Sequence, residues 1–167
     1  METVATGHGH DAKLYGFKRL TQKIRKDSAG LLELEGVVSM IDDLIGIPFV
    51  NGGRTRSGCD CWGLTVLVFK EFGIDLPDYR ISCFASDLID GQISKDKCQW
   101  KRINKPEPPC LVTLRIDPEA PGLVTHLGVC VDENKFMHTM IKRNSVIERM
   151  DHPYFKNRIE GFYAYAG

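Results

Sequence analysis

A cysteine and two histidines in this chain are spaced like the parts of a thiol-based site that cleaves amide bonds. Cys61 follows the glycine-rich stretch 51–58 and precedes the almost wholly apolar segment 64–72. This change of composition predicts a loop and then a buried helix, with Cys61 in its first turn and Gly73 at its end. The positive end of a helix dipole favours the thiolate, which is the form that attacks carbonyl carbon. Cys61 is therefore the candidate nucleophile.

Two histidines lie on consecutive predicted strands after this helix. His126 begins the segment 126–131, and His138 lies in the segment 135–139. A cysteine nucleophile needs a base within hydrogen-bond reach and usually a third polar group that orients the base. We expect His126 to be the base and His138 to orient its ring. Gly128 shares a strand face with His126 and leaves a gap through which a substrate or the cysteine helix could approach.

The turn between these two strands decides whether the histidine rings can meet. Side chains alternate between faces along a strand, so His126 and His138 share a face only if the turn has an odd number of residues. A three-residue turn 132–134 pairs Gly128 with His138 and leaves His126 as the diagonal neighbour, within reach of two imidazole rings. Asn134 tolerates the left-handed conformation that commonly ends such turns. We predict this turn, with both rings on the face toward the start of the cysteine helix.

Two residues just before Cys61 receive structural assignments. Asp60 immediately precedes the predicted helix and is expected to cap the N-H groups of its first turn. Its negative charge would oppose thiolate formation, which argues against a chemical role. Cys59 lies in the loop, away from the helix dipole, and we expect it to contribute little to activity.

The spacing of apolar residues predicts helices first and strands afterwards. Residues 31–45 carry apolar side chains three or four positions apart, which predicts a core-facing helix that includes Ile45, and residues 84–90 predict a short helix. Residues 95–109 are charged and contain proline, so we expect a surface loop with Trp100 tucked inward. Five short β-branched or aromatic segments predict an antiparallel sheet: 111–116, 125–131, 135–139, 146–149 and 159–165. This order is typical of an α+β fold with helices packed on one face of the sheet.

The composition fits one domain with an N-terminal extension. Residues 1–30 are predicted to be a basic leader, helical or disordered, and residues 31–167 the domain. The 167-residue chain balances 22 Lys and Arg against 22 Asp and Glu. No overall basic field therefore points to nucleic acid. No apolar run approaches the roughly 18 residues that a membrane span requires.

The N-terminal residues and the cysteines predict where in the cell the protein is made and whether its cysteines are oxidised. The first residues lack the charged-then-apolar pattern of a secretory signal. We therefore expect cytoplasmic synthesis, with delivery elsewhere only by another machine. Without export, the 6 cysteines are expected as thiols rather than as a disulfide framework.

A series of motifs resembles one known family. In the family's order, and over about residues 37–167, the chain contains Ile47-Pro48-Phe49-Val50-Asn51-Gly52-Gly53, Cys59-Asp60-Cys61-Trp62-Gly63-Leu64, Gly73-Ile74-Asp75-Leu76-Pro77, His126-Leu127-Gly128-Val129, Phe136-Met137-His138 and Ile159-Glu160-Gly161-Phe162-Tyr163. These motifs resemble the NlpC-type cell-wall cysteine peptidases. The phage tail-assembly branch of the family, similar to the C-terminal domain of the lambda tail protein K, fits best.

The resemblance implies a fold and an activity. The fold is the papain-like NlpC-type α+β fold, with N-terminal helices and the catalytic cysteine at a helix N-terminus packed on a central antiparallel sheet. The activity is hydrolysis of peptidoglycan stem peptides, commonly between D-glutamate and the diamino acid, without a cofactor. Cys61, His126 and His138 would form a Cys-His-His triad as nucleophile, base and third member. The branch also implies phage tail-tip proteins as partners and a location in a virion tail or at the cell wall.

The same resemblance places four further residues near the substrate or the oxyanion: Phe49, Asp60, Trp62 and Gly128. The family often has a tyrosine where this chain has Phe49, so one hydroxyl is missing. Loss of one oxyanion donor lowers a rate on the order of a hundredfold or more and leaves the nucleophile intact. The family also often has Gly-Asp where this chain has Pro109-Cys110, a difference that we interpret as structural.

Two other functions fit some of these residues. Cys59, Cys61, His126 and His138 could bind a metal ion, but zinc sites usually space paired cysteines by two to four residues, so Cys-x-Cys is a poor match. A non-catalytic assembly component with the same fold is the second alternative. The missing hydroxyl at Phe49 favours it, and the intact cysteine and histidines oppose it.

Overall fold

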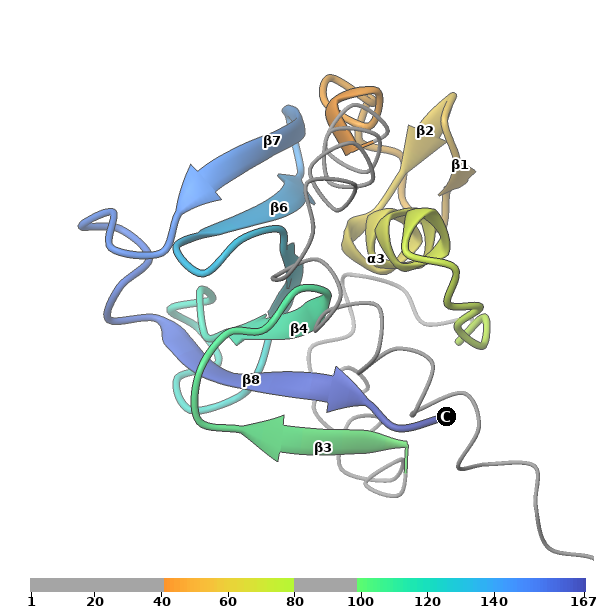
Figure 1. Ribbon diagram of the computed structural model, residues 1–167. Helices are drawn as coiled ribbons and strands as arrows, with labels where there is room; N and C mark the ends of the chain where they lie inside the picture. The colour runs from red at the N-terminus through yellow and green to blue at the C-terminus, as the bar shows by residue number, and fades with distance from the viewer. Residues whose placement is uncertain (1–40, 80–98) are drawn as a thin grey trace, which may run out of the picture.

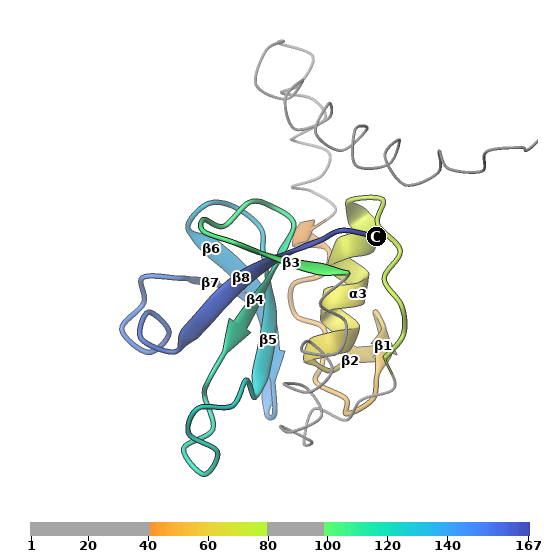
Figure 2. The same cartoon turned by 90° about the horizontal axis from the view of Figure 1, so that it is seen from below.

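An antiparallel sheet and the helix 61–71 form most of the part of the chain that the structure describes. The computed structural model describes residues 41–79 and 99–167, and Figure 1 shows their arrangement. Along the chain the elements are β1 (Arg54–Thr55), β2 (Gly58–Cys59), α3 (Cys61–Glu71), β3 (Trp100–Ile103), β4 (Cys110–Leu114), β5 (His126–Cys130), β6 (Lys135–Met140), β7 (Arg143–Arg149) and β8 (Ile159–Tyr165). The larger sheet has the strand order β3-β8-β4-β5-β6-β7, and β1 and β2 form a separate hairpin. Figure 2 shows α3 and this hairpin on one side of the larger sheet, as the α+β prediction requires.

The sheet carries an apolar cluster on each face. Alternate strand residues pack against α3 on one face and against the β7–β8 connection on the other, as expected for period-two strands. The cluster on the α3 face includes Leu64, Val68 and Phe69 of the helix and Leu111, Leu127, Val129 and Met137 of the sheet. The opposite cluster includes Cys110, Val112, Leu114, Cys130 and Phe136 of the sheet, with Met150 and Phe155. Both faces of the central strands are therefore buried.

The helix begins and ends where the sequence predicts. Asp60 is the N-cap and accepts a hydrogen bond from the Gly63 N-H, a cap that typically stabilises a helix by about 1 kcal/mol. Gly73 follows the last turn with φ 73°, a left-handed conformation that glycine adopts without steric cost. At the other end, a Cβ on Gly63 would lie 2.0 Å from the Gly53 carbonyl oxygen. Glycine at 63 therefore lets the β1–β2 hairpin pack closely against the first turn.

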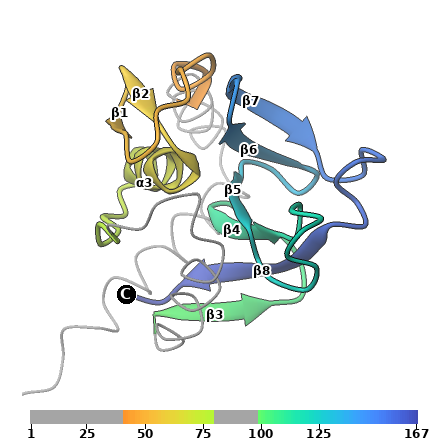
Figure 3. The same cartoon turned by 180° about the vertical axis from the view of Figure 1, so that it is seen from behind.

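The segment before the hairpin lies along the edge of the sheet. The Gly46 N-H donates to the Ser145 carbonyl, and the Ser145 N-H donates to the Ile47 carbonyl, both at 2.9 Å. Figure 3 shows the segment beside the start of β7. Residue Ile45 is 46% exposed, so the prediction that it faces the core is wrong. It lies in the turn before Gly46, where the edge pairing directs the backbone toward β7.

Five predicted strands are confirmed, with ends that differ by at most three residues. One strand of the larger sheet was missed: residues 100–103 form β3, which pairs with β8, so the prediction of a loop throughout 95–109 is wrong. Trp100 is buried as expected, whereas Lys101 and Arg102 are exposed. β3 is an edge strand. Because edge strands often carry charged residues, its sequence lacks the apolar alternation that predicts a strand. The two-residue strands β1 and β2 were also missed, because the glycine-rich segment reads as a loop.

Several sequence predictions lie outside the described residues. These are the leader 1–30, most of the helix 31–45, the helix 84–90 and the thiols Cys83 and Cys98. Within the described part of the chain, no helix is both long and apolar enough to cross a membrane. The four described cysteines, Cys59, Cys61, Cys110 and Cys130, form no disulfide, which confirms the prediction of thiols for these four.

Candidate active site

Cys61 is the first residue of α3, in the position that the sequence predicts. Its side chain is only 3% exposed. The neighbouring thiol has a different environment, because Cys59 lies on β2 and is fully buried. Burial, and to a smaller extent the charge of Asp60, raise the pKa of the Cys59 thiol to about 12. Cys59 is therefore a protonated, inert thiol at neutral pH.

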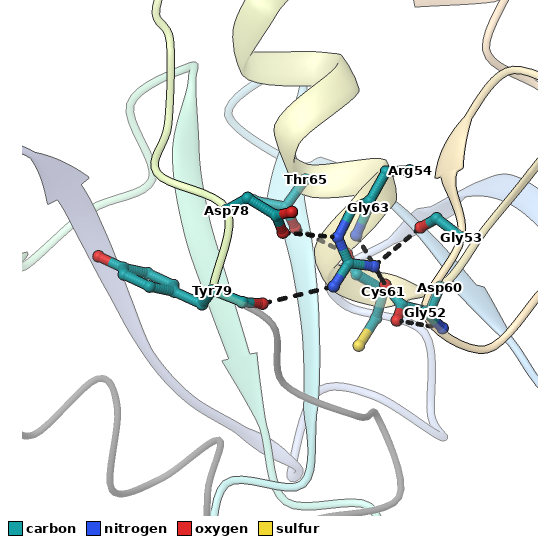
Figure 4. Close-up of polar contacts among 9 residues, drawn as sticks. All are labelled: Gly52, Gly53, Arg54, Asp60, Cys61, Gly63, Thr65, Asp78 and Tyr79. Atoms are coloured by element: carbon teal, nitrogen blue, oxygen red, sulfur yellow. Dashed lines mark hydrogen bonds and ion pairs between the residues drawn. The ribbon is translucent and has the colours of Figure 1, made fainter.

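A buried ion pair fixes the residue just before Cys61. Asp60 is fully buried, and its Oδ1 accepts from the Gly63 N-H and from Arg54 Nη1, both at 2.7 Å. Its Oδ2 accepts from the Gly52 N-H at 2.9 Å. Figure 4 shows these contacts around the first turn of α3. Asp60 has the structural role expected of it, and both its oxygens accept hydrogen bonds within the protein.

The two histidines meet as the strand register predicts. Val129 pairs with Met137 and Cys130 with Phe136, which is the register of a three-residue turn. His126 Nε2 lies 3.0 Å from His138 Nδ1. The prediction that the rings share a face and touch is therefore confirmed.

The turn reaches this register by a conformation other than the expected one. Lys142, with φ 62°, is the only described non-glycine residue with positive φ, so the left-handed conformation expected for Asn134 is wrong. Instead, the Asn134 N-H donates to Asp132 Oδ1 at 2.7 Å. This contact is an Asx turn, which closes the loop without a left-handed residue.

The histidine rings and the body of the helix lie on opposite faces of the sheet. Leu127 and Met137 pack in the cluster of α3, whereas the His138 ring packs against Phe136 and Phe155 at centroid distances of 5.0 and 5.1 Å. The prediction that both rings lie on the face toward the start of the cysteine helix is therefore wrong: they lie on the face opposite the one that packs against α3. His126 is the first residue of β5, so the end of the sheet is where its ring can approach the start of α3.

Gly128 does not leave an open gap. A Cβ at this position would lie 2.6 Å from Phe136 Cδ2 and 3.0 Å from the Met137 carbonyl oxygen. The ring of Phe136 fills the space in which a substrate or the helix was expected. Gly128 is thus required for close packing beside the histidine pair, and the prediction of a gap at this residue is wrong.

Burial keeps both histidines neutral at physiological pH. Burial, and to a smaller extent the nearby His138, lower the pKa of His126 from 6.5 to about 3. Burial, and then the charge of Arg143, lower the pKa of His138 to about 4. His138 Nε2 is buried and has no hydrogen-bond partner within the described residues. The resting pair is therefore two neutral imidazoles that share one proton between Nε2 and Nδ1.

The remaining residues of the expected vicinity surround the helix start. Phe49 is partly exposed and forms a bridge with Cys59. Trp62 is 6% exposed, stacks on Tyr79 at 4.8 Å and meets Trp100 edge-on at 6.4 Å. Trp62 thus belongs to an aromatic cluster next to the thiol. Within residues 41–79 and 99–167, no three His, Cys, Asp or Glu side chains are grouped so that they could hold a metal ion.

Comparison with known proteins assigns this arrangement to a family. The model of the NlpC/P60 family matches residues 46–163, a range that includes Cys61, His126 and His138. The chain belongs to the NlpC/P60 family. Solved structures of NlpC/P60 proteins share its fold. A lipoprotein of the NLP/P60 family from Staphylococcus aureus has a TM-score of 0.57 and 20% identity, over 84% of this chain and 42% of its own. An NlpC/P60 family protein from Bacillus cereus has a TM-score of 0.57 and 19% identity, over 80% and 40%.

Curated NlpC/P60 relatives are longer than the aligned region. Murein DD-endopeptidase MepS/Murein LD-carboxypeptidase of Escherichia coli K12 is 26% identical over 123 residues, which are 73% of this chain and 57% of that protein. The probable endopeptidase NlpC homolog of Haemophilus influenzae is 26% identical over 137 residues, 80% of this chain and 64% of that protein. The chain thus aligns with less than two thirds of either relative.

Proposed function

We propose that the chain is a cysteine peptidase that hydrolyses amide bonds of peptidoglycan stem peptides. In this proposal Cys61 is the nucleophile, His126 the base and His138 the group that orients the base. The observation that carries it is the buried contact between His126 Nε2 and His138 Nδ1 at 3.0 Å, on strands that α3 also contacts. The names of the relatives, murein endopeptidases, support murein as the substrate class. From the family resemblance, we propose that the bond cleaved is the one between D-glutamate and the diamino acid.

The histidine contact assigns the ring nitrogens. Because Nε2 of His126 is engaged by His138, Nδ1 is the nitrogen that would take the thiol proton. His126 would then donate through Nε2 to Nδ1 of His138, which must carry its own proton on Nε2. This tautomer leaves a buried N-H among Phe136 and Phe155. Such an unsatisfied group costs about 1–3 kcal/mol, which the fold offsets elsewhere.

The reaction follows in two stages. The sulfur of Cys61 bonds to the amide carbonyl carbon while its proton passes to His126, and the Cys61 N-H at the positive end of α3 stabilises the oxyanion. The C-N bond then breaks, and the departing amine takes the proton from His126. In the second stage a water attacks the thioester and gives a proton to His126, which returns it to the sulfur as the carboxylic acid leaves. Because the pKa of His126 is low, the imidazolium exists only during the reaction.

Digestion of defined muropeptides, with mass analysis of the fragments, tests this function. The unmodified protein should release two fragments from one amide bond, and Cys61→Ala should release none. Cys59→Ala is the matched control, since it removes a thiol two residues away and should keep near-normal rates. Loss of activity in Cys59→Ala alone would contradict the assignment. Metal analysis of the purified protein tests the alternative of a Cys/His metal site.

A non-catalytic assembly component is the second candidate. Phe49 in place of a tyrosine and the 3% exposure of Cys61 favour it. Intact digestion substrates, together with ordinary thiol reactivity at Cys61, would support this candidate over the enzyme.

We also propose that the protein acts with a phage tail, either in the virion or at the cell wall after delivery. The support is the resemblance of the motifs around Cys61 and His126 to the tail-assembly branch. Proteomic analysis of purified virions from a producing strain tests it. The chain should co-purify with tail-tip proteins, and its absence from virions would contradict the proposal.

A further inference from the structure

The Arg54 side chain makes four polar contacts around the start of α3. The proposed reaction gives this residue no role. Its Nη1 donates to Asp60 Oδ1 at 2.7 Å and to the Gly53 carbonyl at 2.8 Å. Its Nε donates to Asp78 Oδ1 at 3.1 Å, and its Nη2 donates to the Tyr79 carbonyl at 3.4 Å. Figure 4 shows the guanidinium at the first turn of α3, the turn that contains Cys61. The arginine therefore joins the hairpin, the helix start and the segment after the helix.

Arg54 contacts two carboxylates, and one of them, that of Asp60, opposes thiol chemistry at Cys61. Asp60 is adjacent to Cys61 in sequence and fully buried, whereas Asp78 is 57% exposed. A buried negative charge next to a thiol raises the thiol pKa and lowers the thiolate fraction. Water screens the charge of Asp78, but it cannot screen that of Asp60. The guanidinium, whose side chain is 20% exposed, is the charge that offsets it.

The described elements around α3 carry several charged or titratable groups. Lys70 and Glu71 lie in the last turn of α3, away from Cys61, and Arg56 of the hairpin pairs with Glu71. Lys135 begins β6, whereas His138 lies further along that strand. The other groups are Arg54 on β1, Cys59 on β2, Asp60 at the cap, Asp78 after the helix and His126 on β5. The histidines are neutral because burial lowers their pKa values, and Cys59 is protonated because burial raises its pKa. Arg54 and Asp60 form an ion pair at the residue adjacent to Cys61 in sequence.

We propose that Arg54 is a positioning residue that neutralises the N-cap carboxylate of Asp60 and so keeps the pKa of the Cys61 thiol low enough for attack. This inference rests on the proposed role of Cys61 as nucleophile. The cap needs an acceptor oxygen, but an aspartate brings a charge that opposes the thiolate. Arg54 lets the helix keep the charged cap without that effect. The helix dipole then favours the thiolate of Cys61 with less opposition from the cap.

The pH dependence of alkylation tests the proposal without requiring hydrolysis. The full chain is treated with iodoacetamide from pH 5 to 10, and labelling of Cys61 is followed by fragment-ion mass spectrometry. Arg54→Met keeps the length of the aliphatic side chain and removes the charge. Arg54→Lys keeps the charge. Asp60→Asn removes the opposing charge and keeps a good capping residue.

The charges predict a distinct pattern. Arg54→Met should raise the thiol pKa by about one pH unit and slow alkylation at neutral pH about tenfold, whereas Arg54→Lys should change both less. Adding Asp60→Asn to Arg54→Met should restore the wild-type pKa, and Asp60→Asn alone should lower it. A purely structural role would leave the pKa unrestored in the double variant, and this result would overturn the proposal.

If Arg54→Met does not fold, the thiol pKa of the single Asp60→Asn variant still tests the proposal. An unchanged thiol pKa in Asp60→Asn would also overturn the proposal. Muropeptide digestion is measured separately. A protein that cleaves nothing but shows the pattern above would contradict the proposed function and leave the role of Arg54 standing.

Discussion

Substitution of Gly128 by alanine should disturb the histidine pair through the buried ring of Phe136. The added Cβ would lie 2.6 Å from Phe136 Cδ2, whereas non-bonded carbon atoms prefer about 3.5–4.0 Å. The ring must therefore move by roughly 1 Å. It cannot move freely, because Phe136 is fully buried and packs against His138 and Phe155.

The expected cost is that of an overpacked core. Such insertions typically cost about 1–3 kcal/mol, and the Met137 carbonyl oxygen at 3.0 Å is backbone and cannot swing aside. Since Phe136 packs on His138, we expect Gly128→Ala also to lower the rate of hydrolysis. Urea unfolding with comparison of the m value measures the first effect, and muropeptide digestion measures the second.

A second substitution separates this explanation from general strand damage. Phe136→Leu shortens the side chain that blocks the Cβ. In that background Gly128→Ala should cost about 1 kcal/mol less than in the wild type, a coupling that a double-mutant cycle detects. A cost below about 0.5 kcal/mol for the single variant, or no coupling with Phe136, would refute the reasoning.

Three further predictions concern stability. Burial lowers the pKa values of His126 and His138 below 6.5, to about 3 and 4, so between pH 6.5 and about 4 the unfolded chain binds protons that the folded chain does not. The free energy of unfolding should therefore fall as the pH drops through this window, by on the order of 1 kcal/mol per pH unit for each histidine; equal urea midpoints at pH 7 and pH 5 would contradict this. Asp60→Ala removes the cap and the partner of Arg54, and should cost at least about 2 kcal/mol against a smaller loss for Asp60→Asn, measured by urea unfolding. Removal of residues 1–30 should leave a cooperative thermal transition, and its loss would show that the leader belongs to the core.

The features that sequence predicted correctly have local signals. The change from glycine-rich to apolar residues determines where α3 begins, and Asp60 and Gly73 are typical of its two ends. The register of β5 and β6 follows from a count of turn residues, because period two permits only one parity for two residues that share a face. The contact between His126 and His138 could therefore be predicted to the level of strand pairing without any structure.

The features that sequence missed depend on contacts between distant segments. Arg54 and Asp78 are 24 residues apart, and nothing in the hairpin sequence distinguishes this arginine from a surface residue. The position of the Phe136 ring over Gly128 depends on the packing between two strands. β3 was missed because an edge strand carries charged residues on its exposed positions.

The most direct test of the account is capture of the acyl-enzyme during digestion of a defined stem peptide. The reaction is quenched in acid within the first turnover, and the protein is digested with trypsin. Cleavage after Arg56 and Lys70 places Cys59 and Cys61 in one peptide, residues 57–70, so fragment ions between the two cysteines must locate the adduct. The account predicts the mass of the substrate's acyl part on the Cys61 sulfur. An adduct on Cys59, or hydrolysis that continues in Cys61→Ala, would contradict it.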